Sequence, residues 1–152
     1  MNKNVLNKKN NLEINFVKVD ATENQIKILY RLLKKRVHNI SHVSFPSFAD
    51  HTQFVKNHPY RYWFLVQEEE DYIGTIYIKD DNSLGINLSS KPDLIKDSIL
   101  YLVKNFKPLP PVKSIRSEKF HINISPENID FHHILNELGA ELIEYTFTLD
   151  IS

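Results

Sequence analysis

The apolar positions of this sequence follow two different periods, and the changes between them divide the chain into elements. Residues 12–19 (LEINFVKV) alternate between apolar and polar side chains, which predicts a strand. Between residues 23 and 36 the apolar side chains recur every three or four positions, which predicts an amphipathic helix. A second, shorter helix is expected after Ser47, whose hydroxyl can cap its first turn.

The middle of the chain is rich in aromatic and β-branched residues, which are typical of strands. Residues 61–67 (RYWFLVQ) and 72–78 (YIGTIYI) flank an acidic turn, so an antiparallel hairpin is the simplest interpretation. A third strand is expected over 84–88. The helical period returns over 92–106, and Pro92 suits the first turn of a helix.

The C-terminal part predicts a strand over 120–124 and a helix over 127–138 that ends at Gly139. Residues 141–151 alternate strongly and predict a last strand. The predicted order is βααβββαβαβ. Because helices are interspersed among the strands, we expect an α/β (α+β) fold: one mixed, mainly antiparallel sheet with helices on both faces.

Length and composition narrow the class of protein. The chain has 152 residues, enough for one domain with its own core, expected over 12–152, and residues 1–11 are expected to form a flexible tail. Nineteen basic and nineteen acidic residues balance, so no nucleic-acid partner is expected. The absence of cysteine excludes disulfides, thiolate metal sites and Cys nucleophiles. Since no apolar run suits a membrane helix or a signal peptide, we expect a cytoplasmic protein with no membrane partner.

Two segments resemble a known family. Asn128 and Gly139 stand in the predicted last helix region, and the run from Tyr62 to Leu88 has the composition of central sheet strands. Both features resemble the GNAT acyltransferases, whose C-terminal motif reads Asn, two residues, a small residue, three residues, Tyr, three residues, Gly-Phe. Asn128 and Gly139 match this motif. Three positions depart from it: Phe131, Leu135 and Ala140. The stretch HNISHVSFPSF…HPYRYWFLV is also similar to bacterial GNAT proteins encoded with surface-sugar biosynthesis.

The resemblance implies acetyl-CoA as a co-substrate. In the family, the pantetheine arm runs alongside one central strand, and the pyrophosphate lies on backbone N–H groups at the N-terminus of the next helix. The cofactor-binding residues implied here are Ile86, Asn87, Leu88, Ser89, Ser90, Lys91, Asn123 and Asn128. The family's loop reads Arg/Gln-x-x-Gly-x-Gly/Ala, whereas this chain has SSKPDLIKDS, with Leu94, Lys96 and Ser98 where glycines would stand. Acetyl-CoA binding through this degenerate loop stays open, and Asn128 equally suits a local backbone contact.

The candidate catalytic residues are His42 and Tyr145. Many family members use a Tyr as general acid where this chain has Leu135, so a different tyrosine, Tyr145 or Tyr101, would have to replace it. His42 lies in the loop that overhangs the acceptor cleft in GNAT-like folds, and a neutral imidazole there can accept a proton from an amine. A loop histidine with structural hydrogen bonds only is the alternative interpretation.

The candidate substrate-binding residues are His38, His42, Tyr60, Arg61 and Trp63. An aromatic group with an arginine suits a sugar ring or a nucleotide, and it equally suits the edge of a hydrophobic core. We predict no metal site at His38 and His42, because Asn39, Ser41 and Pro46 indicate a loop there.

Two hypotheses therefore follow from the sequence. In the first, the protein is an N-acetyltransferase that moves acetyl from acetyl-CoA to a small-molecule amine acceptor, such as an amino sugar or its nucleotide. In the second, it is a degenerate GNAT-like domain that binds a ligand or a protein without catalysis. A homodimer is compatible with both.

Overall fold

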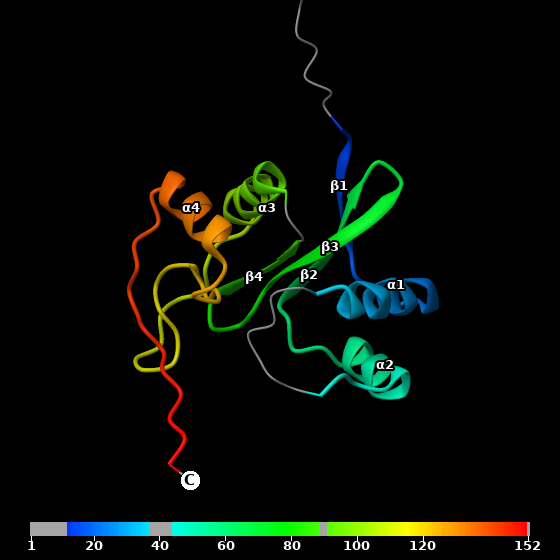
Figure 1. Cartoon of the computed structure of the whole chain (residues 1–152), viewed down its shortest axis with the longest axis horizontal. Helices are drawn as coiled ribbons and strands as arrows, with labels where there is room; N and C mark the ends of the chain where they lie inside the picture. Colours follow the sequence, from blue (N-terminus) through cyan, green and yellow to red (C-terminus); the bar gives the residue numbers. More distant parts are fainter. Residues whose placement is uncertain (1–11, 37–43, 89–90, 152) are drawn as a thin grey trace, which may run out of the picture.

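The computed structural model describes residues 12–36, 44–88 and 91–151 (Figure 1). Its elements in chain order are β1 (Ile14–Lys18), α1 (Glu23–Lys34), α2 (Phe48–Lys56), β2 (Tyr62–Glu68), β3 (Asp71–Ile78), β4 (Ser83–Leu88), α3 (Pro92–Asn105), β5 (His121–Ile122) and α4 (Ile129–Glu137). The predicted order is confirmed as far as the last helix. The predicted tail, residues 1–11, lies outside the described residues.

The five strands form one mixed sheet in the order β1-β2-β3-β4-β5. Neighbouring strands from β1 to β4 are antiparallel, whereas β5 runs parallel to β4. The hairpin expected from the sequence is formed by β2 and β3. Glu69 adopts the left-handed region in its tight turn, with φ of 54°.

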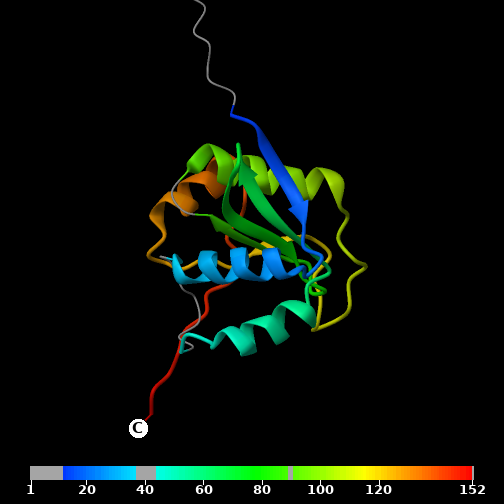
Figure 2. The same cartoon turned by 90° about the vertical axis from the view of Figure 1, so that its right-hand side faces the viewer.

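Helices cover both faces of this sheet, as predicted. Figures 1 and 2 show α3 and α4 on one face and α1, with α2 beside it, on the other. The side chains of β2 alternate between the two layers. Trp63 and Leu65 are buried with residues of α1 and α2, whereas Phe64 and Val66 are buried with residues of α3.

Side-chain caps fix the starts of three helices. Thr22 accepts a hydrogen bond from the backbone N–H of Gln25 in α1, and Ser47 accepts one from Asp50 in α2. Asn128 does the same for Phe131 in α4. Each cap satisfies one backbone donor that the first turn of a helix leaves unpaired. The helix α3 instead begins with Pro92, which lacks that donor.

The strand predicted over residues 141–151 is not formed, which is a correction to the sequence analysis. After α4, Gly139 ends the helix with φ of +76°, as predicted, and residues 140–151 do not form a strand. The apolar side chains of this segment are exposed to solvent, from 64% for Leu142 to 90% for Ile151. Alternation alone cannot make a strand, because the backbone groups also need a neighbouring strand.

No helix among the described residues is long and apolar enough to cross a membrane.

Candidate functional site

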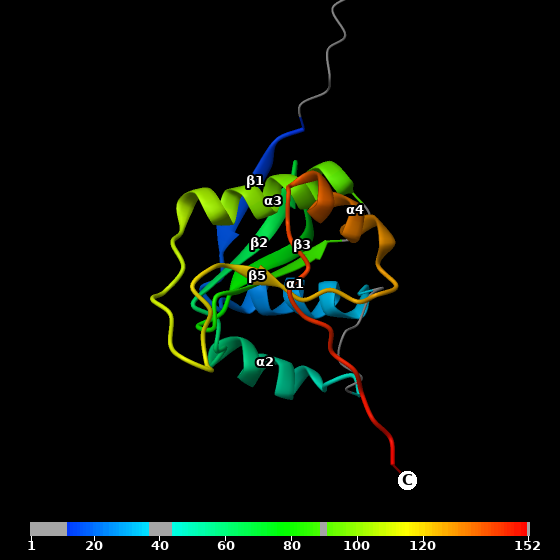
Figure 3. The same cartoon turned by 90° about the vertical axis from the view of Figure 1, so that its left-hand side faces the viewer.

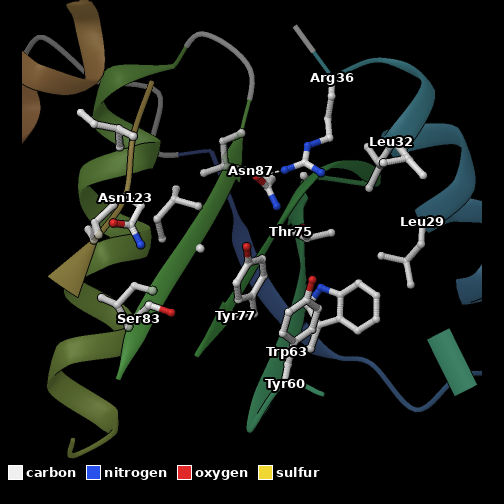
Figure 4. Close-up of a pocket in the computed structure, with 18 of the residues that line it drawn as sticks. Leu29, Leu32, Arg36, Tyr60, Trp63, Thr75, Tyr77, Ser83, Asn87 and Asn123 are labelled. Carbon is white, nitrogen blue, oxygen red and sulfur yellow. Dashed lines mark hydrogen bonds between the residues drawn. The ribbon is translucent and has the colours of Figure 1, made fainter. Parts of the chain in front are cut away.

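A cleft opens where β4 and β5 separate (Figure 4). β5 pairs with β4 only at Ser83 and Leu84, opposite His121 and Ile122. Among the described strands, the rest of β4 pairs with β3 alone. The cleft has a volume of about 640 Å³ and is lined by residues of α1, β3, β4 and the β5–α4 connection. The backbone of Gly85–Leu88 therefore offers this cleft an edge that can accept an extended ligand.

Asn82 lies where β4 and β5 are still paired, next to the point at which the two strands separate. Its side chain is fully buried and its φ is 68°, a backbone conformation that asparagine tolerates well. The side-chain amide donates to the carbonyls of Leu109 and Ser117, both at 2.9 Å, and accepts from the N–H of Leu109 at 2.7 Å. The backbone carbonyl of Asn82 accepts from the N–H of His121 at 3.2 Å. One residue thus ties the start of β4 to the loop that leads into β5.

An aromatic wall forms one end of the cleft. The rings of Tyr60 and Tyr77 are stacked, with centroids 4.0 Å apart, and Trp63 meets Tyr60 edge to face at 5.0 Å. Gly85 allows this arrangement, because a Cβ there would lie 2.0 Å from the Tyr77 ring. Such rings present apolar faces and polar edges to a ligand.

Two polar groups of this wall are suited to a ligand. The indole N–H of Trp63 is buried and has no hydrogen-bond partner among the described residues, and Trp63 lines the cleft. Buried donors are normally paired, so an acceptor on a ligand or a water is expected there. Burial, together with the neighbouring Tyr77, raises the pKa of Tyr60 to about 12. The Tyr60 hydroxyl therefore keeps its proton at neutral pH and can act as a donor.

The charged side chains of the cleft are all basic. Arg36 donates from Nη2 to Oδ1 of Asn87 at 2.7 Å, so α1 and β4 meet across the cleft (Figure 4). Lys35 and Lys79 also belong to the lining, and no aspartate or glutamate occurs among the described residues that form it. This charge pattern favours an anionic ligand.

His51 is the histidine that the structure places at the cleft. It is buried on α2, and its Nε2 lies 3.1 Å from the carbonyl oxygen of Ile26, so this nitrogen carries the proton and donates. Burial lowers the pKa of His51, partly offset by that hydrogen bond. The ring is consequently neutral near pH 7.

The β5 side of the cleft is lined by the connection from β5 to α4. Asn123, Ser125 and Asn128 contribute amide and hydroxyl groups there, and Ile122 and Phe131 contribute apolar ones. The Asn128 Oδ1 accepts from the N–H of Phe131 at 3.3 Å. Its local capping contact, one of the two interpretations left open by the sequence, is thus present, while the residue still lines the cleft.

The structure brings together most of the described residues that were predicted to bind cofactor. Five of them line the cleft: Ile86, Asn87, Leu88, Asn123 and Asn128. Lys91 does not line it, and its ammonium group is ion-paired with Glu68. Ser89 and Ser90 lie outside the described residues.

The predicted substrate-binding and catalytic residues are divided. Tyr60 and Trp63 line the cleft. Arg61 does not: its guanidinium donates to the carbonyl of Lys107 at 3.0 Å and lies over the ring of Tyr62. Tyr145 is 75% exposed on the segment after α4 and is absent from the lining. His38 and His42 lie outside the described residues.

Sequence reasoning missed Arg36, Tyr77 and Asn82. Arg36 belongs to a basic run at the end of a helix, where such residues suit the helix dipole and also suit an anion site, and nothing in the sequence shows that β4 lies opposite. Tyr77 is one of several tyrosines in a strand pattern. The position of Asn82 in a turn gave a weak signal, since asparagine in such turns often has a left-handed backbone.

Among the described residues, no group of three or more His, Cys, Asp or Glu side chains is placed to hold a metal ion.

The architecture defines a class of fold. It is an α+β fold with a mixed, mostly antiparallel five-stranded sheet and helices on both faces, and it resembles the fold of a solved structure. The particular solved structure that it resembles is described as a possible acetyltransferase from Clostridium difficile 630, with a TM-score of 0.51. The match covers 93% of this chain and 98% of that chain at 13% sequence identity. No protein-family model and no curated protein matches this sequence. At such low identity the likeness shows the fold alone.

Proposed function

We propose that this protein is an N-acyltransferase that transfers acetyl from acetyl-CoA to the primary amine of a small anionic acceptor. The observation that carries the proposal is the cleft beside β4, which combines an unpaired strand edge with a basic lining. The extended arm of acetyl-CoA, with its two amides, suits the strand edge, and its phosphates suit the basic lining. The fold of a possible acetyltransferase supports the same activity.

The strand edge suits the pantetheine arm. Gly85–Leu88 has no strand partner on its cleft side among the described residues, so backbone groups there can pair with amides of the ligand as an added strand would. Backbone N–H groups of Asn87 or Leu88 would then lie near the thioester and could stabilise a negative charge on its oxygen.

The phosphates would have to be bound by charge more than by a glycine cradle. The loop before α3 lacks the glycines of the family, and Lys91 is engaged by Glu68. Lys35, Arg36 and Lys79 offer the positive charge that the lining contains. We therefore expect acetyl-CoA to bind with an affinity that falls steeply as salt is added.

The aromatic wall suits the acceptor. Tyr60, Trp63 and Tyr77 offer faces for a ring and two donors for its oxygens, the Tyr60 hydroxyl and the Trp63 N–H. Sugar rings present both apolar faces and hydroxyl oxygens. Amino sugars that carry a phosphate or nucleotide would also satisfy the basic lining, so they are the first acceptors to test.

The reaction would be a direct transfer. The amine nitrogen attacks the thioester carbonyl carbon, the C–S bond breaks, and CoA leaves as a thiolate that takes up a proton. The amine must also lose a proton. No carboxylate among the described lining residues can accept it, so this role falls to water or to His42. The cleft contributes mainly by holding amine and thioester in line.

A second candidate function is ligand binding without catalysis. Leu135, where the family commonly has its general acid, is packed among apolar side chains of α3 and α4. No carboxylate occurs among the described lining residues, and the loop before α3 lacks the family's glycines, so these features together favour a domain that retains the cleft but not the chemistry. The two functions differ in turnover, not in binding.

The first experiment is a calorimetric titration with acetyl-CoA of three proteins: the natural chain, Arg36→Glu and Arg31→Glu. We expect saturable binding that Arg36→Glu weakens about tenfold, since one charge reversal in the cleft is worth on the order of 1.4 kcal/mol. Arg31→Glu makes the same charge change on an exposed part of α1 outside the cleft and is expected to bind normally.

Release of free CoA thiol with amino-sugar phosphates and nucleotides then separates the two functions. Turnover supports the acyltransferase, and binding without turnover for any of these acceptors supports the binding domain. If no binding is found up to millimolar acetyl-CoA, the proposal of an acetyl-CoA enzyme is wrong.

A further inference from the structure

Asn87 presents its backbone and its side chain to different parts of the cleft. Along β4 the side chains alternate: Ile86 and Leu88 pack with residues of α3, whereas the Asn87 side chain lies on the face that α1 covers. The backbone groups of β4 lie in the plane of the sheet, along the edge that β5 leaves open. A ligand that extends along this edge therefore leaves the Asn87 side chain available to a second ligand on the α1 side.

A hydrogen bond across the cleft joins that side chain to Arg36. Nη2 of Arg36 donates to Oδ1 of Asn87 at 2.7 Å, and Figure 4 shows the two side chains pointing toward each other. Arg36 is exposed, and no carboxylate of the described residues lies within ion-pair distance of it. A guanidinium has five N–H donors and binds a phosphate or a carboxylate more strongly than a neutral amide. An anionic ligand is therefore expected to take Arg36 from Asn87.

Once Arg36 pairs with an anion, Oδ1 of Asn87 needs another donor, and the N–H of an amine can supply it. We propose that Arg36 and Asn87 select an acceptor whose amine and anionic group are neighbours, with the anion on Arg36 and the amine on Oδ1 of Asn87. This proposal rests on the proposed function, because it names the acceptor class of the same cleft. The charge of Arg36 still acts through space on the phosphates of acetyl-CoA.

The geometry of the pair sets the spacing of the two groups on the acceptor. The two contacted atoms, Nη2 of Arg36 and Oδ1 of Asn87, are 2.7 Å apart. Asn87 is fixed on a strand that pairs with Thr75 in β3, whereas Arg36 follows the end of α1 and its long side chain can rotate. A ligand that inserts between them needs its amine and its anion on neighbouring carbons. An anion at the far end of a sugar ring would lie beyond Arg36 while the amine contacts Asn87.

The aromatic wall lies beside this pair. In Figure 4 the hydroxyl end of Tyr77 points toward Asn87, and Gly85, two residues before Asn87 in β4, leaves room for the Tyr77 ring. Burial raises the pKa of Tyr60 and the charge of Arg36 lowers it in part, so this arginine lies within electrostatic reach of the Tyr60 hydroxyl. A sugar that places a phosphate on Arg36 and an adjacent amine on Asn87 can thus rest its ring against the wall.

The test is a calorimetric titration, without acetyl-CoA, of three probes: glucosamine 1-phosphate, glucosamine 6-phosphate and glucose 1-phosphate. The first two carry the same groups, but only the first has its amine and phosphate on neighbouring carbons. The third has the phosphate in the same place and no amine. We expect glucosamine 1-phosphate to bind about tenfold more tightly than either of the others, since each of them forgoes one charge-assisted hydrogen bond.

Two variants separate the two contacts. Arg36→Gln is expected to lose the preference over glucosamine 6-phosphate and to keep the preference over glucose 1-phosphate, whereas Asn87→Ala is expected to lose both. Lys34→Gln is the matched control, because it removes one charge from the same end of α1. Its ammonium group lies over the Tyr30 ring at 4.5 Å and not in the cleft lining, so both preferences should remain. Trp63 fluorescence checks that each variant is folded.

Several results would overturn this proposal: equal binding of the two glucosamine phosphates by the natural chain, no binding of any probe up to millimolar concentration, or an Arg36→Gln protein that keeps its preference for the 1-phosphate. Since acetyl-CoA is absent from these titrations, the two proposals can fail separately. The expected preferences without release of CoA would support the Arg36–Asn87 pair and contradict acyl transfer. Turnover of amino sugars without these preferences would support the enzyme and contradict the pair.

Discussion

Replacing Asn82 tests how the cleft is held open. Asn82→Ala removes three hydrogen bonds of 2.7–2.9 Å from a fully buried side chain and leaves the partner groups of Leu109 and Ser117 unpaired. At about 1 kcal/mol for each bond, the loss is about 3 kcal/mol. Alanine at φ 68° adds about 1 kcal/mol. We therefore expect the free energy of unfolding to fall by about 4 kcal/mol.

The assay is urea unfolding followed by the fluorescence of Trp63, the single tryptophan of the chain. Asn82→Gly is the matched control, because it loses the same hydrogen bonds but relieves the backbone strain. It is expected to be about 1 kcal/mol less destabilised than Asn82→Ala. A loss below about 1 kcal/mol for Asn82→Ala would show that the Asn82 side chain does not hold the start of β4 against the loop that leads into β5.

Three further predictions concern the cleft and its surroundings. Gly85→Ala places a Cβ 2.0 Å from the Tyr77 ring, so we expect about 1–3 kcal/mol of destabilisation in urea and weaker acetyl-CoA binding, whereas a tolerated alanine would mean that Tyr77 moves freely. Trp63→Phe removes the unpaired indole N–H. We expect the free energy of unfolding, followed by circular dichroism, to change by less than about 1.5 kcal/mol, and the affinity for acetyl-CoA to fall. An unchanged affinity would show that this N–H does not contact the ligand. Burial lowers the pKa values of His51 and His58, so the unfolded chain binds more protons than the folded one as pH falls below 6.5. Urea midpoints should be constant above that pH and decrease below it, and His51→Gln should reduce the decrease.

Periodicity predicted the framework of the fold because most elements bury one face. The hairpin of β2 and β3 was predicted from its aromatic and β-branched residues, and Leu65 and Val66 are both fully buried because helices cover both faces of the sheet. The amphipathic stripe of α1, with Ile26 and Leu29 buried, predicts its helix from periodicity. A local signal, Gly139, also predicted correctly where α4 ends. Each of these signals depends on neighbours in sequence.

Residues whose positions depend on distant partners could not be predicted. Strand alternation would put Trp63 on the same face as Arg61 and opposite Tyr60, but β2 begins only at Tyr62, so the alternation does not extend back to Tyr60. In the structure Tyr60 and Trp63 pack together and Arg61 turns to Lys107. The contact between Arg36 and Asn87 joins residues 51 positions apart, and no periodicity encodes it. The strand expected over 141–151 could not be decided from its own residues, because alternation does not show whether a neighbouring strand is there to pair with it.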